Sequence, residues 1–542
     1  MTRLPIVAYC LLFAVLHSAC KNGQNKPSKD KTDSIAIKQK EIQDASIPGG
    51  FSSQTILHFD SSALTGFVSR YPAFKKFEND LKSFYRQRNY AYAWYDSKGL
   101  IEQAGNLYNR IVNINDEGLP DKFAYRDSFT VVMDSLQGMT NNIAPNTSAE
   151  LMLTAQYFSY AQIAWQGLSE EESRSLEWNL PRRKVNLVQL MDSLLYDGDA
   201  FVAKEPVYRQ YALLKNYLKK YRDIEASGGW TNITPDKKKY AIGDSSSVIA
   251  TLRQRLFQLG DIPEDNKSVV FDTSMLNGIK AFQQRLGIKQ DGIVGASFFT
   301  EINYPIGKRI EQVIVNMERC RWLPAEPSVP YLAVNIPEFA LHAYNGDSLL
   351  WSMEVVVGKA VHETVIFSGQ LKYVVFSPYW NVPPGILKNE VLPGMKRNPN
   401  YLRNHNMEWN GGAVRQKPGP SNSLGLVKFL FPNSYNIYLH DSPAKSLFQE
   451  DKRAFSHGCI RVSRPKDLAK WLLRDYPEWT DDKITKAMNG GKEQYFTLKE
   501  TVPVFIAYFT AWVDREGKLN FRDDIYKRDN RLAKAIMEQP RI

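Results

Sequence analysis

Cysteine is scarce in this sequence of 542 residues, which contains only four: Cys10, Cys20, Cys320 and Cys459. A disulfide scaffold is therefore excluded, because domains that depend on disulfides carry many more cysteines. Long apolar runs are absent as well. The longest extends over residues 5–16, whereas a membrane-spanning helix needs about 20 residues. The hydrophobic share of 43% and the charged share of 23% exclude a disordered or collagen-like chain, and the length indicates about three or four domains.

The sequence also lacks a strong concentration of charge of one sign. The 69 Lys and Arg residues exceed the 58 Asp and Glu residues, for a net charge of +11, but this excess is spread thinly along the chain. Such a balance suits an anionic environment without indicating a nucleic acid. We find no P-loop, no Rossmann fingerprint and no cluster with metal-ligand spacing, so no cofactor is expected.

The N-terminus has the features of an export signal. Arg3 precedes the apolar run, and the small residues Ser18 and Ala19 precede Cys20. This arrangement resembles a bacterial lipoprotein signal, in which the cysteine is lipidated and becomes the first residue of the mature protein. His17 stands where an aliphatic residue is usual, so a plain secretory signal is the alternative.

Export leads to several further expectations. Residues 1–20 would form the signal peptide, Cys20 would carry the lipid, and the polar residues 21–50 would form a flexible tether. The protein would then be anchored to a membrane of the cell envelope, facing the periplasm, with no nucleic acid as a partner. After removal of the signal and lipidation of Cys20, the remaining cysteines are Cys320 and Cys459. They could form one disulfide or stay as free thiols.

Periodicity divides the rest of the chain into three parts and predicts a multidomain α+β protein. Residues 51–235 are expected to form a helical scaffold domain, because apolar residues recur there at helical spacing. Residues 236–305 are expected to form a small helical module with two main helices, which Asp244 and Asp272 could cap. Residues 306–542 contain β-branched and aromatic runs of period two and are expected to form a β-rich domain.

The β-rich domain contains six predicted strands: Tyr331–Ile336, Phe339–Tyr344, Leu349–Gly358, Lys372–Phe376, Lys428–Phe431 and Asn436–His440. A helix is predicted over residues 463–473, with Ser463 as its cap. Residues 384–422 are rich in Pro, Gly and Asn and have few apolar runs. Long stretches without secondary structure in a compact domain are usually binding loops or lids, so a lid is expected there.

One cysteine and one histidine carry the chemistry that the sequence indicates. In the alternation of the last predicted strand, His440 shares a face with Tyr438 and points into a polar pocket. Cys459 follows Gly458, so the backbone can turn sharply and present the sulfur together with nearby N–H groups. In thiol acyl transfer the thiolate is the nucleophile, and a neighbouring histidine lowers the thiol pKa or takes its proton. We expect Cys459 to be the nucleophile and His440 its base.

The neighbours of Cys459 are expected to shape the site. Backbone amides around His457 and Gly458 could stabilise an oxyanion, and one such donor contributes about 2.7–4 kcal/mol in other enzymes. Ser456 would help to shape the loop. Arg461 lies on the same strand face as Cys459 and could hold a substrate carboxylate through two hydrogen bonds.

Interpretations without catalysis are open at this point. Buried cysteines are mostly inert core residues, and Cys320, which has no histidine near it, is expected to be a packed thiol. A structural zinc site could be built only from His440, Asp441, His457 and Cys459. This set contains a single thiolate and its spacing is irregular, which disfavours zinc binding. No metal is therefore expected.

The segment from His440 to Arg461 closely resembles the signature of YkuD-type L,D-transpeptidases, in which fifteen residues separate the histidine from Ser456-His457-Gly458-Cys459-Ile460-Arg461. Flanking segments resemble the large YcbB-like branch of that family: residues 316–319, 376–383 and 510–512. Residues 281–295 resemble a peptidoglycan-binding-like domain, and this branch has its scaffold, binding-like and catalytic segments in the same order. Two residues depart from the branch, Cys320 in place of an aromatic residue and Asp441 in place of Gly or Ser. In the family, the residue at position 441 orients the histidine through its backbone carbonyl.

The resemblance implies a two-step acyl transfer on peptidoglycan stem peptides. Cys459 would attack the carbonyl of the third residue, a diamino acid, in a tetrapeptide stem and release the terminal D-alanine. The amine of a neighbouring stem would resolve the thioester and give a 3→3 cross-link, without a cofactor. Tyr379, Trp380 and Asn381 are expected to line the substrate cleft, although Trp380 could be a core residue, and residues 236–305 could contact the glycan.

Three alternatives to this function stay open on the sequence alone. An L,D-carboxypeptidase would use the same residues with water as the acceptor, and a related enzyme would attach a protein lysine to the wall. A lipoprotein with an inactive catalytic domain would bind the wall through residues 236–305. The intact Cys459 and His440 pair argues against the last of these.

Overall fold

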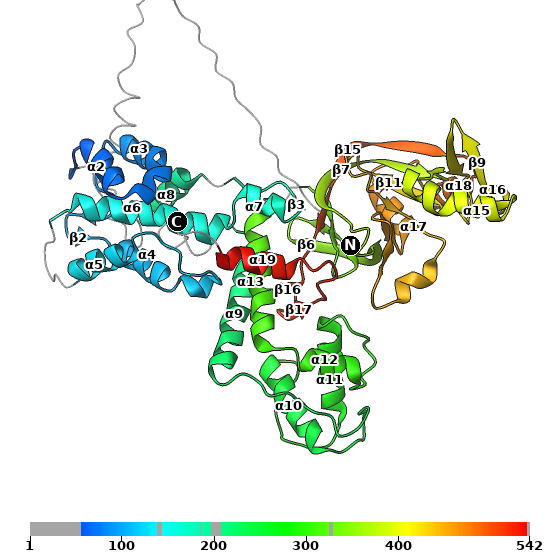
Figure 1. Cartoon of the computed structure of the whole chain (residues 1–542), viewed down its shortest axis with the longest axis horizontal. Helices are drawn as coiled ribbons and strands as arrows, with labels where there is room; N and C mark the ends of the chain where they lie inside the picture. Colours follow the sequence, from blue (N-terminus) through cyan, green and yellow to red (C-terminus); the bar gives the residue numbers. More distant parts are fainter. Residues whose placement is uncertain (1–55, 138–143, 185, 197–206, 325–328, 539–542) are drawn as a thin grey trace, which may run out of the picture.

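The computed structural model describes residues 56–137, 144–184, 186–196, 207–324 and 329–538. The predicted signal peptide, the lipidation site Cys20 and the tether lie outside these ranges. No helix within them combines the length and the apolar character that a membrane span requires. Figure 1 shows three arms that meet at a junction of helices: a helical arm, a smaller helical arm and an arm built on a large β-sheet.

The first arm is helical, as the periodicity predicts. Its long central helix α6 (Thr147–Ala161) is buried along almost its whole length and lies between the other helices of the arm (Figure 1). Apolar residues on all sides of a helix require burial on all sides, and α6 meets that requirement. The surrounding elements are α2 (Ser62–Arg70), η1 (Pro72–Phe77), α3 (Glu78–Gln87), β1 (Tyr95–Asp96), β2 (Gly99–Leu100), α4 (Glu102–Val112), η2 (Ile114–Glu117), α5 (Arg126–Gln137), η3 (Gln162–Gln166), α7 (Glu170–Ser175) and α8 (Leu187–Tyr196).

The second arm is the small helical module, formed by α10 (Ser247–Leu259), α11 (Thr273–Arg285) and α12 (Ala296–Ile302). Asp272 caps α11 as predicted, because its carboxylate accepts a hydrogen bond from Met275 N at 2.8 Å. The prediction for Asp244 is wrong: Ser246 caps α10, and Asp244 accepts a hydrogen bond from Ala241 N in the preceding turn. The hydrophobic core of this arm continues into α9 (Gln210–Ala226) and the hairpin of β16 (Ala511–Val513) and β17 (Leu519–Phe521).

The third arm contains a ten-stranded sheet in the order β11-β12-β14-β6-β5-β4-β15-β7-β3, with β13 paired to β6 off this path. A further pairing of β11 with β7 closes eight of these strands into a ring. All six predicted strands are present, but two differ clearly in length: β7 begins at Ile366, before the predicted Lys372, and β12 is confined to Leu439–His440. The strands are β4 (Tyr331–Asn335), β5 (Ala340–Asn345), β6 (Ser348–Gly358), β7 (Ile366–Phe376), β11 (Val427–Leu430), β12 (Leu439–His440), β13 (Ala454–Ser456), β14 (Ile460–Val462) and β15 (Gln494–Ala507).

Helices α17 (Pro465–Leu472) and α18 (Asp481–Asn489) accompany the sheet. The predicted helix over residues 463–473 is present as α17, but Ser463 does not cap it. The hydroxyl of Ser463 donates to the Glu354 carboxylate at 2.9 Å, and the helix begins at a proline, which needs no N–H partner.

The predicted lid is folded, so the expectation of a stretch without secondary structure is wrong. The folded unit begins before the predicted bounds of 384–422, at β8 (Trp380–Asn381). It continues with α14 (Pro384–Ile386), the π-helical turn η5 (Leu387–Val391), α15 (Leu392–Arg397), α16 (Tyr401–Asn404), β9 (Met407–Asn410) and β10 (Ala413–Gln416). Three buried valines form a core of its own: Val382, Val391 and Val414. These valines are far apart in the sequence, which is why no apolar run predicted them. The lid lies at the outer end of the sheet arm (Figure 1).

Helix α13 (Ile306–Trp322) joins the three arms at the junction, where it packs on α9 and on the C-terminal helix α19 (Asp529–Glu538). Its Glu318 carboxylate is fully buried and accepts hydrogen bonds from Leu168 N at 2.6 Å, Trp322 Nε1 at 2.9 Å and Arg321 at 2.7 Å. The scaffold also contributes β3 (Trp178–Asn179), which pairs with β7 at the edge of the sheet. The scaffold and the sheet therefore share one hydrophobic core.

Gly167 tests the importance of this junction. Its φ is +65°, and an added Cβ would collide with the Glu318 carboxylate. Gly517 is the matched control, because its φ is +75° and no atom lies within 4 Å of the Cβ position. Gly517→Ala carries the cost of a backbone with positive φ, about 1–2 kcal/mol. Gly167 has a ψ of −149°, in a region that is essentially restricted to glycine, so Gly167→Ala carries a backbone cost of about 1–3 kcal/mol in addition to the collision. We expect Gly167→Ala to lower the melting temperature by about 5 °C more than Gly517→Ala does, measured by calorimetry. Equal shifts would contradict the proposed role of Glu318.

Candidate active site

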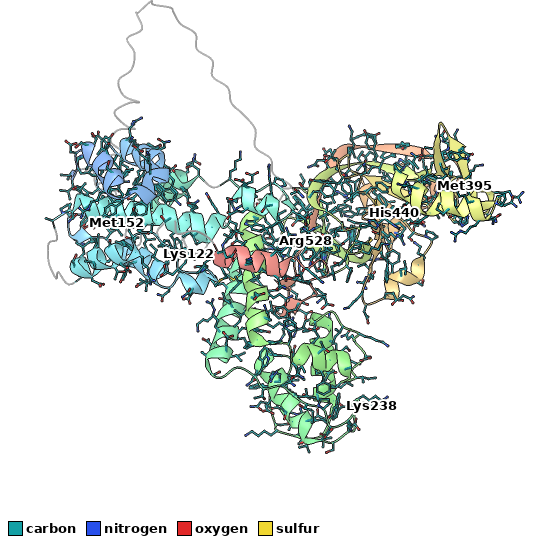
Figure 2. All side chains as sticks on the ribbon, viewed as in Figure 1. Lys122, Met152, Lys238, Met395, His440 and Arg528 are labelled. Atoms are coloured by element: carbon teal, nitrogen blue, oxygen red, sulfur yellow. The ribbon has the colours of Figure 1, made fainter. Side chains whose placement is uncertain are left out.

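Two short neighbouring strands bring the predicted catalytic residues onto one face of the sheet. Strands β12 and β14 are parallel, and His440 pairs with Arg461 while Leu439 pairs with Ile460. Leu439 and Ile460 are fully buried in the core, so His440 and Arg461 point to the opposite face. Cys459 precedes Ile460 and therefore lies on the same face as His440. Figure 2 shows His440 inside the sheet arm, with the lid residue Met395 farther out.

The ring of His440 is fixed in the orientation and tautomer of a base. Its Nδ1 donates to the backbone carbonyl of Asp441 at 2.5 Å, which leaves the lone pair on Nε2. Burial lowers the pKa of His440 to about 3, and the positive charges of Arg461 and Lys428 act in the same direction. Hydrogen bonds to the carbonyls of Asp441 and Leu424 oppose this shift without reversing it. His440 is therefore neutral at physiological pH and able to accept a proton.

The Cys459 thiol is half-buried and free, and it makes no hydrogen bond to His440 in this structure. Among the hydrogen bonds of the described residues, none joins Cys459 Sγ to His440; the thiol donates to the Asn436 carbonyl at 3.6 Å. Burial raises the pKa of Cys459, although hydrogen bonds with Tyr438 and the charge of Arg461 lower it in part. The resting pair is thus a thiol beside a neutral imidazole. Of the two activation routes that the sequence leaves open, this state favours transfer of the thiol proton to His440 during attack.

The turn before Cys459 is held by the Ser456 side chain. Ser456 Oγ accepts a hydrogen bond from Gly458 N at 3.1 Å and donates to the Cys459 carbonyl at 2.5 Å. Gly458 has a φ of +108°, a backbone conformation that residues other than glycine rarely adopt. Because Gly458 N–H already has a partner, it is not free to bind an oxyanion. Cys459 N–H makes no hydrogen bond within the part of the chain that the structure describes.

The side chain of His457 reaches towards the lid. Its Nε2 lies 3.5 Å from the Glu390 carboxylate of η5, and its ring lies 5.0 Å from the ring of His362. Burial lowers the pKa of His457, and Glu390 opposes this shift. His457 thus connects the turn of the nucleophile with the lid.

Arg461 and Lys428 make this face of the sheet positive. Lys428 pairs with His440 across β11 and β12, so its side chain is on the same face, and its ammonium lies 3.6 Å from the Glu493 carboxylate. Arg461 forms no ion pair among the described residues, and its buried Nε has no hydrogen-bond partner. Buried guanidinium groups usually have partners, so this arrangement favours an anionic ligand.

Lys428 was not identified from the sequence as a site residue. The only available signal was a lysine between Val427 and Phe429 in an otherwise apolar strand. Its position beside His440 depends on the pairing of β11 with β12, which a single sequence does not reveal.

Asp441 has a structural role. Its carboxylate accepts hydrogen bonds from Leu426 N at 2.8 Å and Ser442 N at 2.7 Å and forms an ion pair with Lys445. Gly425 packs so closely against it that a Cβ there would collide with the carboxylate. The Asp441 side chain is thus occupied elsewhere, and only its backbone carbonyl contacts His440.

The three predicted cleft residues lie at the base of the lid. Tyr379 N donates to the Glu493 carboxylate at 2.9 Å, and Arg415 lies 4.1 Å from the centre of the Tyr379 ring. Trp380 packs against the valine core of the lid, whereas Asn381 is exposed. Contact of these residues with a substrate stays a prediction.

Two further predictions concern Cys320 as a packed thiol and the absence of a metal site. Cys320 is fully buried and free, which confirms the packed thiol and excludes a disulfide with Cys459 in this structure. Within the described ranges, no group of three or more His, Cys, Asp or Glu side chains is arranged to hold a metal ion.

Three family models match the chain in the order expected. A scaffold domain matches residues 79–218, a "Putative peptidoglycan binding domain" matches residues 245–302, and an L,D-transpeptidase catalytic domain, YkuD, matches residues 330–504. The last match contains His440 and Cys459. The sheet arm is a YkuD-type L,D-transpeptidase catalytic domain. Domains of these kinds indicate a location outside the cytoplasm.

Known proteins agree with this assignment over part of the chain. A curated relative from Haemophilus influenzae, described as a "Putative L,D-transpeptidase", is 32% identical over 246 residues, which cover 42% of this chain and 49% of the relative. The chain thus spans about half the length of that relative. Two solved L,D-transpeptidase structures, from Xylanimonas cellulosilytica and Stackebrandtia nassauensis, are similar over 51% of this chain and over 100% and 97% of their own. Their identities are 14% and 13% and their TM-scores 0.18 and 0.21, too low to support an argument.

The pH dependence of thiol reactivity tests the protonation state of the YkuD domain. Because burial raises the pKa of Cys459, the thiol is protonated at pH 7. Iodoacetamide reacts with the thiolate, so its rate with Cys459 should rise steadily with pH up to at least about pH 9. The rate is measured by mass spectrometry of the Cys459 peptide, with Cys459→Ser as the control. A plateau between about pH 6 and pH 8 would instead indicate a thiolate–imidazolium pair.

Proposed function

We propose that this protein is a peptidoglycan L,D-transpeptidase that forms 3→3 cross-links through a cysteine thioester. The observation that carries the proposal is the shared face of β12 and β14, where a fixed neutral His440 lies beside the strand position of Cys459. The match of residues 330–504 to the L,D-transpeptidase catalytic domain supports it. The match of residues 245–302 supports peptidoglycan as the substrate and a glycan contact through that module.

The first step forms the thioester. Rotation of the Cys459 side chain to another staggered rotamer directs the thiol towards His440. Sγ attacks the carbonyl carbon of the third stem residue as the thiol proton moves to His440 Nε2. The free Cys459 N–H is the first candidate donor to the resulting oxyanion. The tetrahedral intermediate collapses when the C–N bond breaks, and His440 returns the proton to the departing amine of D-alanine.

The second step transfers the acyl group. An amine of a neighbouring stem attacks the thioester and gives up a proton to His440, which then protonates the departing Cys459 thiolate. One amide replaces another, so the reaction needs no nucleotide. His440 must be neutral at the start of both half-reactions, and its burial keeps it neutral at physiological pH.

Arg461 and Lys428 would bind carboxylates of the stem peptide. Arg461 has no carboxylate partner among the described residues, and a carboxylate of the third stem residue or of D-alanine would supply one. Tyr379, Trp380 and Asn381 would form the lid side of the cleft. The proposal includes export, with lipid attached to Cys20 anchoring the protein to a membrane of the envelope and the catalytic domain facing the periplasm.

Incubation with purified tetrapeptide stems tests the proposal and separates transfer from hydrolysis. The expected products are a dimer of stems and free D-alanine, detected by liquid chromatography and mass spectrometry. Cys459→Ala and His440→Gln should reduce dimer formation by at least about 1000-fold, since removal of a nucleophile or a base has this effect in comparable enzymes. Shortened stems without dimers would indicate an L,D-carboxypeptidase. Full dimer formation by Cys459→Ala would contradict the mechanism.

A further inference from the structure

A buried threonine lies directly behind the turn of the nucleophile. Thr364 precedes β7 and is 0% exposed, so it cannot contact a substrate. Its hydroxyl donates to the Gly458 carbonyl at 2.8 Å and accepts a hydrogen bond from Gly358 N at 2.9 Å. One side chain thus connects the end of β6, the start of β7 and the residue before Cys459.

A tyrosine from the C-terminal part of the chain holds Thr364 in place. The Tyr526 hydroxyl accepts a hydrogen bond from Thr364 N at 3.1 Å and donates to the Gly358 carbonyl at 2.6 Å. Tyr526 is 7% exposed and stacks on Tyr508. The two hydroxyls and the N–H and C=O of Gly358 all have partners within this small network, which makes the network rigid.

Gly358 makes this arrangement possible. The segment after β6 folds back so tightly that a Cβ at Gly358 would collide with the His362 carbonyl and lie 2.9 Å from Thr364 N. The close approach places the Thr364 hydroxyl below the turn of Gly458.

The hydrogen bond from Thr364 fixes a peptide plane that the proposed reaction needs. In a trans peptide the C=O of one residue and the N–H of the next point in opposite directions. Because the Gly458 C=O points into the core towards Thr364, the Cys459 N–H points away from it. Ser456 binds the peptide groups on either side of this plane, at Gly458 N and the Cys459 carbonyl, whereas Thr364 binds the carbonyl of the Gly458–Cys459 peptide itself. Glycine rotates more freely than other residues, so this direct restraint matters at Gly458.

We infer that Thr364 is a positioning residue that orients the Cys459 N–H towards the oxyanion, with Tyr526 supporting it. This inference rests on the proposed function, because it assigns the donor for that reaction. Thr364 acts through the Gly458–Cys459 peptide and touches neither the substrate nor the thiol.

Comparison of two reactions of the same thiol tests the inference. Acylation by the carbapenem imipenem creates an oxyanion, whereas alkylation by iodoacetamide does not. Thr364→Val keeps the shape of the side chain but removes the hydroxyl. We expect Thr364→Val to lower the rate of imipenem acylation by about 10- to 100-fold, a part of the 10²- to 10³-fold lost when an oxyanion donor is removed. The alkylation rate should stay within about two-fold of wild type, and Thr364→Ser should restore acylation.

Two further variants keep the test decisive. Thr154→Val removes a buried hydroxyl in the scaffold, where Thr154 accepts a hydrogen bond from Trp94 Nε1 at 2.8 Å, and should leave the ratio of the two rates unchanged. Tyr526→Phe should lower the ratio in the same direction by a smaller factor and carries the test if Thr364→Val does not fold. If Thr364→Val leaves the ratio of the acylation rate to the alkylation rate unchanged, the inference is overturned. The same holds for Tyr526→Phe if Thr364→Val does not fold. An equal loss of both reactions would overturn it too.

The same data separate the inference from the proposed function. If wild type is acylated by imipenem but does not join stem peptides, the proposed function fails while the role of Thr364 can still be measured. If imipenem does not acylate wild type at all, the proposed function fails first, and with it the reaction that Thr364 would serve.

Discussion

The parallel pairing of β12 with β14 is the constraint on which the site depends. These strands are only two and three residues long, yet their register places His440 and Cys459 on one face and buries Leu439 and Ile460 on the other. A shift by one residue would turn every side chain of a strand to the opposite face. The apolar pair in the core therefore stabilises the register that the proposed catalytic pair needs. The hydrogen bonds of Ser456 and Thr364 extend this order into the turn before Cys459.

The electrostatics of the site follow from burial and from the surrounding cations. Lys428 and Arg461 disfavour a second positive charge on His440, and burial disfavours charge on both His440 and Cys459. The resting site is accordingly uncharged at its reacting atoms and positive around them. In the proposed reaction, this combination would attract an anionic stem peptide and delay charge formation on Cys459 until the substrate is bound.

Much of this organisation could be predicted from the sequence because it is local. The spacing from His440 to Cys459, the period-two strands and the cap at Asp272 depend on neighbouring residues, and the structure contains all of them. Contacts between distant residues could not be predicted in this way. Lys428 beside His440, Glu390 beside His457, and Thr364 behind Gly458 come from pairings and close approaches that leave no periodic trace. The lid was misjudged for the same reason, since its three core valines come from separate short segments. Whether Cys459 forms a hydrogen bond with His440 depends on the rotamer of the Cys459 side chain, which the sequence does not encode directly.

The central claim is that Cys459 is an accessible nucleophile whose acylation depends on His440. The most direct measurement is the intact mass of the protein after incubation with a carbapenem, for wild type, Cys459→Ser and His440→Gln. We expect a single covalent adduct on wild type, none on Cys459→Ser, and an adduct on His440→Gln that forms at least about 100-fold more slowly. A folded wild-type protein that remains unmodified, or a His440→Gln variant acylated at the wild-type rate, would contradict this claim.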